Sequence, residues 1–187
     1  MRILYLSYDG LTDPLGQSQI IPYIKGLCQL GHTFDIVSFE KAQRFEQQGT
    51  QIQQELKKHA IQWHPLPFKQ RIPLISSAFN LVRFKSTVKK ITSTQNIDCI
   101  HCRSYQSAFI ASQIKNIKII FDIRGFWVDE RLDGAIWNIQ HPLFRYFYFS
   151  LKQKERKLFQ RANHIVSLTE KGKEIIQNTY TRSTPID

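Results

Sequence analysis

The chain has 187 residues, of which 42% are hydrophobic, and a net charge of +11. This length suits one domain with its own core, and the composition is that of an ordinary globular protein. No apolar stretch approaches the ~18 to 20 residues that a membrane-spanning helix needs. Three cysteines without framework spacing favour a reduced cytoplasmic setting over a secreted one.

The first half of the chain alternates between expected strands and helices. Ile3 to Leu6 is a short apolar run typical of a buried strand, and a glycine-bearing loop follows it. Apolar residues at helical spacing then predict a helix that ends at Gly31, because glycine readily takes the left-handed conformation after a helix. The next expected elements are a strand at 33–39, a helix at 50–59, a strand at 61–65, a proline-bearing loop at 66–73 and an amphipathic helix at 74–92.

The second half continues the alternation. Its expected elements are a strand at 97–102, a short helix at 105–113, a strand at 117–123, a long irregular loop at 124–140, a helix at 141–162, a strand at 165–168 and a helix at 170–178. This order predicts an α/β fold of the Rossmann-like kind. Its sheet is doubly wound and mostly parallel, with helices on both faces.

Ligands of such sheets bind at the carboxyl ends of the strands, and this rule selects the polar residues that matter. The expected strands are followed by a set of polar, glycine and aromatic residues that should share one rim of the sheet. The candidates are Asp9, Gly10, Gly16, His101, Arg103, Asp122, Arg124, Trp127, Asp129 and Glu130.

The opening loop suggests a phosphate or sugar-phosphate site. A strand that leads through Gly10 and Gly16 into a helix can point backbone N–H groups and the positive helix end at a ligand. The alternative is a surface loop whose glycines serve turn geometry alone. The spacing is not G-x-G-x-x-G, which argues against a dinucleotide-binding enzyme that uses NAD.

The segment FDIRGFWVDE carries groups suited to a sugar or a phosphate. Asp122 and Arg124 are two apart, so an extended backbone places them on one face. The planar guanidinium of Arg124 suits phosphate or carboxylate, Trp127 offers a plate for a sugar ring, and Asp129 and Glu130 can accept from hydroxyl groups. The alternative is an Asp122–Arg124 pair that only ties down the following loop.

The end of the strand at 97–102 reads Cys-Ile-His-Cys-Arg. Residues three apart in a strand point to opposite faces, and no second pair of ligands accompanies Cys99 and Cys102, so we expect no metal site here. His101 can hydrogen-bond or shuttle a proton, or it can be structural.

The positive charge is regional. Residues 61–120 hold nine basic and one acidic side chain, including Arg83, Lys85, Lys89 and Lys90. This suggests an anionic partner, and the basic helix at 74–92, with Phe79 and Phe84 as insertion points, supports an alternative function as a membrane-surface module that binds anionic lipid. No nucleic-acid-binding motif is present, so nucleic acid is not expected as a partner.

The runs DGLTDPLGQSQ, GH and SFEK in the opening, together with FDIRGFWVDE, resemble bacterial family 4 retaining glycosyltransferases of the two-domain GT-B architecture. The resemblance implies that residues 1–187 are the N-terminal, acceptor-side domain, and that a C-terminal domain absent from this chain binds most of the donor. The implied partners are a nucleotide-sugar and a glycan or lipid-linked acceptor, and no metal or further cofactor is implied.

The resemblance also assigns roles and a setting. It implies His101 and Asp122 as catalytic candidates. It further implies substrate-binding residues, namely Gly10, Gly16, Arg103, Arg124, Trp127, Asp129 and Glu130. Relatives often carry a further histidine where this chain has Arg103, so a neutral base is missing at that position. The expected setting is cell-envelope polysaccharide synthesis in the cytoplasm, peripheral to the inner face of the membrane.

Overall fold

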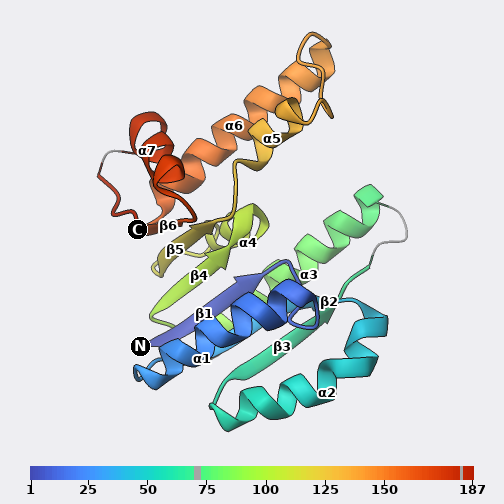
Figure 1. The fold of residues 1–187 in the computed structure, drawn as a ribbon, viewed down its shortest axis with the longest axis vertical. Coiled ribbons are helices and arrows are strands. Elements are labelled where there is room, and N and C mark those ends of the chain that lie inside the picture. The colour runs from blue at the N-terminus through green and yellow to red at the C-terminus, as the bar shows by residue number, and fades with distance from the viewer. Residues whose placement is uncertain (70–72, 182) are drawn as a thin grey trace.

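A computed structural model describes residues 1–69, 73–181 and 183–187, and it centres on a six-stranded sheet in the order β3-β2-β1-β4-β5-β6 (Figure 1). Every neighbouring pair in this sheet is parallel. The strands are β1 (Arg2–Ser7), β2 (Thr33–Glu40), β3 (Gln62–Pro67), β4 (Cys99–Arg103), β5 (Lys118–Ile123) and β6 (His164–Ser167). The expected doubly wound α/β fold is confirmed.

Helices cover both faces of the sheet, and the sheet separates two hydrophobic cores. One face carries a π-helical turn η1 (Gly16–Ile20), which continues into α1 (Ile21–Gln29), and α2 (Ala42–Lys58). The other face carries α3 (Pro73–Thr94), α4 (Ser104–Ala111) and α6 (Pro142–Arg161). Two shorter helices follow β5 and β6, namely α5 (Trp127–Asp133) and α7 (Glu170–Thr179).

The two cysteines of β4 confirm the alternation expected from the sequence. Cys99 is buried in the core beneath α1 and α2, whereas Cys102 is buried in the core beneath α3 and α4. Burial raises the pKa of both thiols, which keeps them protonated and unreactive.

The crossovers change direction between β1 and β4, and this leaves part of one face open. From β1 the chain proceeds to β2 and β3 on one side, and after β3 it crosses back to β4 and continues outward to β6. Helices α1 and α2 therefore pack over β1 to β3, while Ile120 of β5 and Val166 of β6 on the same face stay partly exposed. A cleft can form at the edge of this cover.

Two expected boundaries were wrong. Helix α2 begins at Ala42 rather than at residue 50, and Gly49 lies inside it. A Cβ on Gly49 would come within 2.8 Å of the Phe45 ring, so the glycine makes room for that side chain within the helix. The loop expected at 124–140 contains helix α5, whose first turn carries Asp129 and Glu130, favourable there because of the helix dipole.

The edge strand β3 extends to Pro67, which shortens the loop expected at 66–73. Its prolines are tolerated because an edge strand has one unpaired side. Part of that loop, residues 70–72, lies outside the described residues, as does Arg71 of the basic region.

The orientation of α3 corrects a further expectation. Phe84 is fully buried in the core, so its assignment as a membrane insertion point was wrong. Phe84 and Val88 point inward one helical turn apart, whereas Phe79 and Val82 face outward.

We predict that Gly16→Ala destabilises the domain by ~1 to 3 kcal/mol, measured by urea unfolding. A Cβ at this position would lie 2.2 Å from the backbone oxygen of Gly10 and 2.6 Å from Cα of Leu11, and neither atom can move aside alone. The matched control is Gly26→Ala in α1, where a Cβ meets nothing within 4 Å. That control should be neutral or stabilising by up to ~1 kcal/mol, and equal losses for the two variants would contradict the close approach.

Candidate functional site

The parallel register brings side chains of four strands together at the carboxyl end of the sheet. Tyr5 of β1 pairs with His101 of β4. Two residues closer to the strand ends, Arg103 lies in a single cross-sheet row with Ser7, Asp122 and Val166 of β6. The row lies at the β1–β4 switch point, the place where open α/β sheets bind ligands.

A cleft of about 300 Å³ opens beside this row, at the lower end of the range of small-molecule sites. Its lining comes from β1, the turn η1, α1, β4, β5 and β6. The lining residues are Tyr5, Gln19, Tyr23, His101, Arg103, Asp122, Arg124 and Val166.

The charged groups of the cleft are buried close together but poorly paired. His101, Arg103 and Asp122 are each no more than 5% exposed. The Oδ1 atom of Asp122 is 3.4 Å from Nε of Arg124, and its Oδ2 atom is 3.8 Å from Nε2 of His101. Arg103 donates one hydrogen bond, from Nη2 to Gln19 Oε1 at 2.8 Å.

Several polar atoms in this cluster have no hydrogen-bond partner among the described residues. They are His101 Nε2, Arg103 Nε and Nη1, Asp122 Oδ1 and Arg124 Nε. Leaving a buried donor or acceptor unpaired costs about 1 to 3 kcal/mol. A group of such atoms around one cleft is therefore better explained by a ligand that completes their hydrogen bonds than by a role in stability.

Aromatic rings hold His101 in place. The Tyr5 ring lies 4.8 Å from the imidazole, between ring centres, and the Tyr23 ring meets it edge-on at 5.7 Å. Burial and the nearby Asp122 carboxylate raise the pKa of both tyrosines, so their phenols stay neutral hydrogen-bond donors.

The glycine loop departs from the expected phosphate cradle. The buried carboxylate of Glu40 accepts hydrogen bonds from the backbone N–H groups of Leu11, at 2.8 Å, and Thr12, at 3.1 Å. These two amides therefore serve Glu40 and are not free to bind a ligand.

Gly10 and Gly16 are buried and do not line the cleft. A Cβ on Gly10 would lie 2.7 Å from the backbone oxygen of Phe39, so both glycines permit close packing of the loop. Direct contact of either glycine with a substrate stays a prediction.

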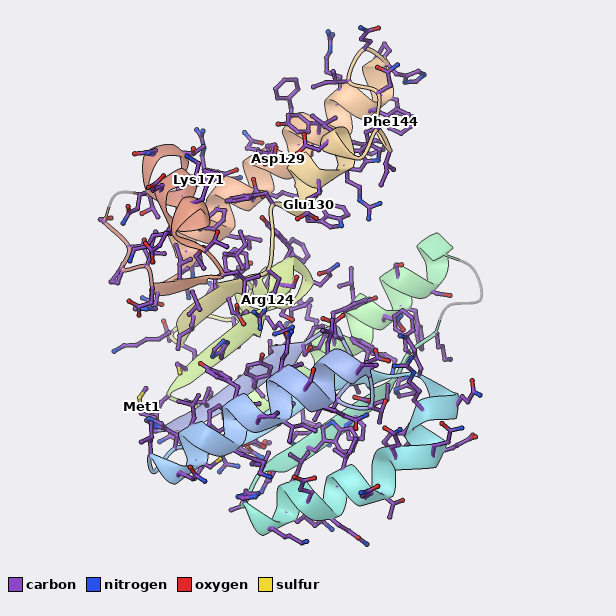
Figure 2. The ribbon with its side chains drawn as sticks, viewed as in Figure 1. Met1, Arg124, Asp129, Glu130, Phe144 and Lys171 are labelled. Atoms are coloured by element: carbon purple, nitrogen blue, oxygen red, sulfur yellow. The ribbon has the colours of Figure 1, made fainter. Side chains whose placement is uncertain are left out.

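The residues after β5 lie in different surroundings. Figure 2 shows Arg124 at the end of the sheet, with Asp129 and Glu130 farther out on α5. Arg124, Asp129 and Glu130 line a second cleft of about 410 Å³ between α5 and the start of α7, so Arg124 borders both clefts. Of the residues expected at this rim, His101, Arg103, Asp122 and Arg124 line one cleft. The expectation that Glu130 and Gly16 open onto the same cleft was wrong, because Glu130 lines the second cleft and Gly16 lines neither.

Asp129 and Trp127 already have partners. Asp129 accepts from Tyr148 Oη at 3.0 Å and from Lys152 Nζ at 2.8 Å, which ties α5 to α6. Trp127 meets the Trp137 ring edge-on and lies beneath the guanidinium of Arg131. It lines an apolar groove between α4 and α6 rather than the polar cleft. Their direct substrate contacts stay predictions.

Sequence reasoning missed four residues that build the site. Tyr5, Gln19 and Tyr23 line the cleft, and Glu40 anchors the glycine loop. Tyr5 was predicted only as part of an apolar strand. Gln19 was missed because it precedes the apolar residues, from Ile20 onward, that predicted the helix ending at Gly31. Glu40 lies within the SFEK run, so its unusual place at the end of an apolar strand was the available signal.

Two features missing from the described part of the chain bear on the alternatives. Among these residues, no group of three His, Cys, Asp or Glu side chains is arranged to hold a metal ion. None of the helices there combines the length and apolar character that crossing a bilayer requires.

Comparison with known structures first defines the class of fold. A sucrose-phosphate synthase from Thermosynechococcus elongatus matches over 100% of this chain and 47% of its own, with a TM-score of 0.64 and 11% identity. MurG from Acinetobacter baumannii matches over 99% and 44%, with 0.53 and 10%. UGT89C1 from Arabidopsis thaliana, complexed with UDP, matches over 99% and 48%, with 0.52 and 12%. The chain thus has the Rossmann-like fold found in GT-B glycosyltransferases, and it spans about half the length of these proteins.

The family follows from the sequence. A model of Glycosyltransferase Family 4 matches residues 20–186, so the chain belongs to that family. The resemblance noted from the sequence motifs is confirmed. A search of curated proteins finds no match.

Two buried aspartates provide a test of the site. Asp35 on β2 accepts from Arg2 Nε and His64 Nε2, both at 2.9 Å, whereas Asp122 on β5 has only the longer contacts described above. We predict that Asp35→Asn costs about 1.5 to 3 kcal/mol of folding stability, as expected for hydrogen bonds to a charged group. Asp122→Asn should cost less than Asp35→Asn, because Asp122 loses two longer ion-pair contacts, to Arg124 at 3.4 Å and to His101 at 3.8 Å, rather than two short hydrogen bonds. Similar losses for the two variants in urea unfolding would make Asp122 a structural residue.

The same pair differs in acid. Burial raises the pKa of Asp35, but the hydrogen bonds from His64 and Arg2 outweigh it and hold the pKa below its ordinary value. Its stabilisation is therefore present above the unfolded carboxyl pKa of about 4 and is lost as the pH falls through the lower folded value. The stability difference between wild type and Asp35→Asn should shrink over that range.

Proposed function

We propose that this chain is the acceptor-side domain of a retaining glycosyltransferase, which moves a sugar from a nucleotide-sugar to a glycan or lipid-linked acceptor. A second, C-terminal domain outside this chain would bind most of the donor. The proposal is supported by membership of Glycosyltransferase Family 4 and by the share of each GT-B structure that the chain covers. The single observation that carries it is the buried, unpaired polar cluster at the β1–β4 switch point.

The cluster suits an acceptor hydroxyl group. Asp122 Oδ1 is an unpaired acceptor, and His101 Nε2 lies on the other side of the same carboxylate. In the proposed reaction the acceptor oxygen bonds to the anomeric carbon, the bond to the diphosphate breaks, and the electron pair leaves with the diphosphate. The new bond forms on the face from which the diphosphate leaves, so the anomeric configuration is retained. Asp122 would accept the hydroxyl hydrogen bond and then the proton, and His101 would hold that carboxylate in position.

The proposed setting is cell-envelope polysaccharide synthesis in the cytoplasm, peripheral to the inner face of the cell membrane. No cofactor beyond the nucleotide-sugar substrate is proposed. The basic α3 supports peripheral contact with anionic lipid. Residues 61–120, with nine basic and one acidic side chain, have a net charge of +8, and this favours an anionic partner surface over a neutral one.

We predict that the purified 187-residue chain gives no turnover with any nucleotide-sugar, whereas the complete gene product transfers sugar. The physical reason is that the chain supplies one wall of the reaction site, and transfer needs donor and acceptor held together. The measurement is release of nucleoside diphosphate and mass-spectrometric detection of the glycosylated acceptor in a cell-envelope extract.

A variant separates chemistry from folding. Asp122→Asn in the complete gene product should lower the transfer rate by about a hundredfold or more. Lys57→Asn, an exposed residue at the end of α2 that does not line the polar cleft, is the control and should retain full activity. Robust transfer by the 187-residue chain alone, or full activity of Asp122→Asn, would contradict the proposal.

A second candidate function, binding to an anionic membrane surface, is favoured by the outward face of α3. Phe79 and Val82 are exposed on this face, and Lys89 and Lys90 follow on it. The Phe79 ring is approached by Lys69 Nζ, at 4.5 Å, and by the Arg83 guanidinium, at 5.7 Å. This mixture of apolar and cationic groups is typical of helices that lie at a lipid surface.

We predict weak binding to phosphatidylserine vesicles that disappears as salt rises, because each basic group near such a surface contributes ~1 kcal/mol and salt screens it. Co-sedimentation of the chain should fall at least tenfold in the double variant Lys89→Glu, Lys90→Glu. The matched control Lys57→Glu, Lys58→Glu changes the charge equally on α2 and should bind like wild type. Equal losses in both pairs would show a response to net charge rather than to the α3 face, and binding that is absent at low salt would remove the candidate.

A further inference from the structure

The polar cleft has more positive than negative charge on its walls. Arg103 and Arg124 line it, and Asp122 is the one carboxylate among its lining residues. The remaining lining residues add no acidic group, and burial keeps the phenols of the two tyrosines protonated by raising their pKa. One cationic group in the cleft is therefore left without a counter-charge from the cleft wall.

Arg103 is the more telling of the two arginines. It is 4% exposed, its Nη2 atom donates to Gln19, and its Nε and Nη1 atoms have no hydrogen-bond partner in the part of the chain that the structure describes. The Asp9 carboxylate stands 3.8 Å from its Nε atom and is itself half exposed to water, too far for a hydrogen bond. A buried guanidinium with two unpaired nitrogens is costly, and it is stable in proteins when an anion or several oxygen acceptors complete it.

Arg124 brings a second guanidinium to the same space. Its Nε atom faces Asp122 Oδ1 at 3.4 Å without forming a hydrogen bond, and its side chain is 28% exposed. The cleft therefore presents cationic donors from β4 and from the end of β5, with the Asp122 acceptor next to them. A neutral sugar could occupy the Asp122 oxygen through a hydroxyl, but its hydroxyl oxygens would accept from the two guanidinium groups without the charge assistance that an anion gives.

We propose that the acceptor of this enzyme carries an anionic group, a phosphate or a carboxylate, that binds between Arg103 and Arg124 while one of its hydroxyls donates to Asp122. This inference rests on the proposed function, since it assigns the cleft to the acceptor. Charge-assisted hydrogen bonds to two arginines recognise the anion, and the adjacent carboxylate orients the hydroxyl. The substrate class is thus a phosphorylated or uronic-acid-type glycan rather than a neutral one.

The test is a set of separate titrations of the 187-residue chain with glucose 6-phosphate, glucuronate, glucose and UDP. Binding is monitored by calorimetry and by the NMR signals of the arginine Nε–Hε groups. We expect at least one of the two anionic sugars to bind tenfold or more tightly than glucose and to shift the Arg103 and Arg124 signals. Arg103→Gln and Arg124→Gln should each weaken that binding by about 10- to 100-fold, the effect of a hydrogen bond to a charged group. Arg156→Gln on α6, an exposed arginine outside the cleft, should bind like wild type.

Thermal unfolding of each variant separates lost binding from lost folding, and Lys replacements of the two arginines, which keep the charge, should restore part of the affinity. If neither anionic sugar binds better than glucose, or if Arg156→Gln weakens binding as much as the cleft variants, the proposal is overturned. If UDP binds through Arg103 and Arg124 while neither anionic sugar binds, the cleft belongs to the donor, and the proposal of an anionic acceptor is also overturned.

A sugar-transfer assay of the complete gene product tests the proposed glycosyltransferase function independently of the anion subsite. If it transfers sugar, and Arg103→Gln and Arg124→Gln transfer as fast as wild type to the identified acceptor, the anion subsite fails while the glycosyltransferase assignment stands. If an anionic sugar binds through the two arginines but no nucleotide-sugar supports transfer, the subsite stands and the glycosyltransferase assignment fails.

Discussion

The change of crossover direction between β1 and β4 is the constraint on which the site depends. Right-handed connections force α1 and α2 onto one face over β1 to β3, and they force α3, α4 and α6 onto the other. The cover over β4 to β6 on the first face is therefore incomplete. Polar ends of strands that would otherwise be sealed in the core can open onto a cleft there, and His101, Arg103 and Asp122 lie at that boundary.

The lack of hydrogen-bond partners distinguishes the polar cluster of the cleft from other buried carboxylates among the described residues. Asp35 and Glu40 are buried carboxylates whose hydrogen bonds are made within the chain, by Arg2 and His64 in one case and by the loop amides in the other. Asp122 is buried to a similar degree, but its Oδ1 atom has no hydrogen-bond partner among the described residues. Well-paired buried groups stabilise the fold, whereas the unpaired cluster lowers its stability. A bound substrate that supplies the missing hydrogen bonds would remove that destabilisation.

The fold could be predicted well because it follows from apolar periodicity, which decides strands and helices locally. Predicted helix boundaries were wrong where a tertiary contact decides them. A glycine such as Gly49 suggests a helix end in the sequence, and only the structure shows that the Phe45 ring fills the space where its Cβ would lie. Phe84 and Phe79 look alike in the sequence, and only the packing of α3 shows which of them faces the core.

The candidate site could be predicted in part. The rule that ligands meet strand ends found His101, Arg103, Asp122 and Arg124, which line one cleft. It could not show that Glu40 takes the loop amides, because that contact joins residues far apart in the sequence. It also could not place Trp127 toward the apolar groove, since the direction of a side chain after a strand depends on the helix α5 that the sequence did not reveal.

The most direct test of the central claim is a crystal structure of the complete gene product with a nucleotide-sugar analogue and the acceptor that the transfer assay identifies. The account predicts that an acceptor hydroxyl lies within hydrogen-bond distance of Asp122 and that the unpaired atoms of Arg103 and His101 gain partners from the bound substrates. An acceptor bound elsewhere, with this cluster still unpaired and filled only by solvent, would contradict the assignment of the β1–β4 switch point as the functional site.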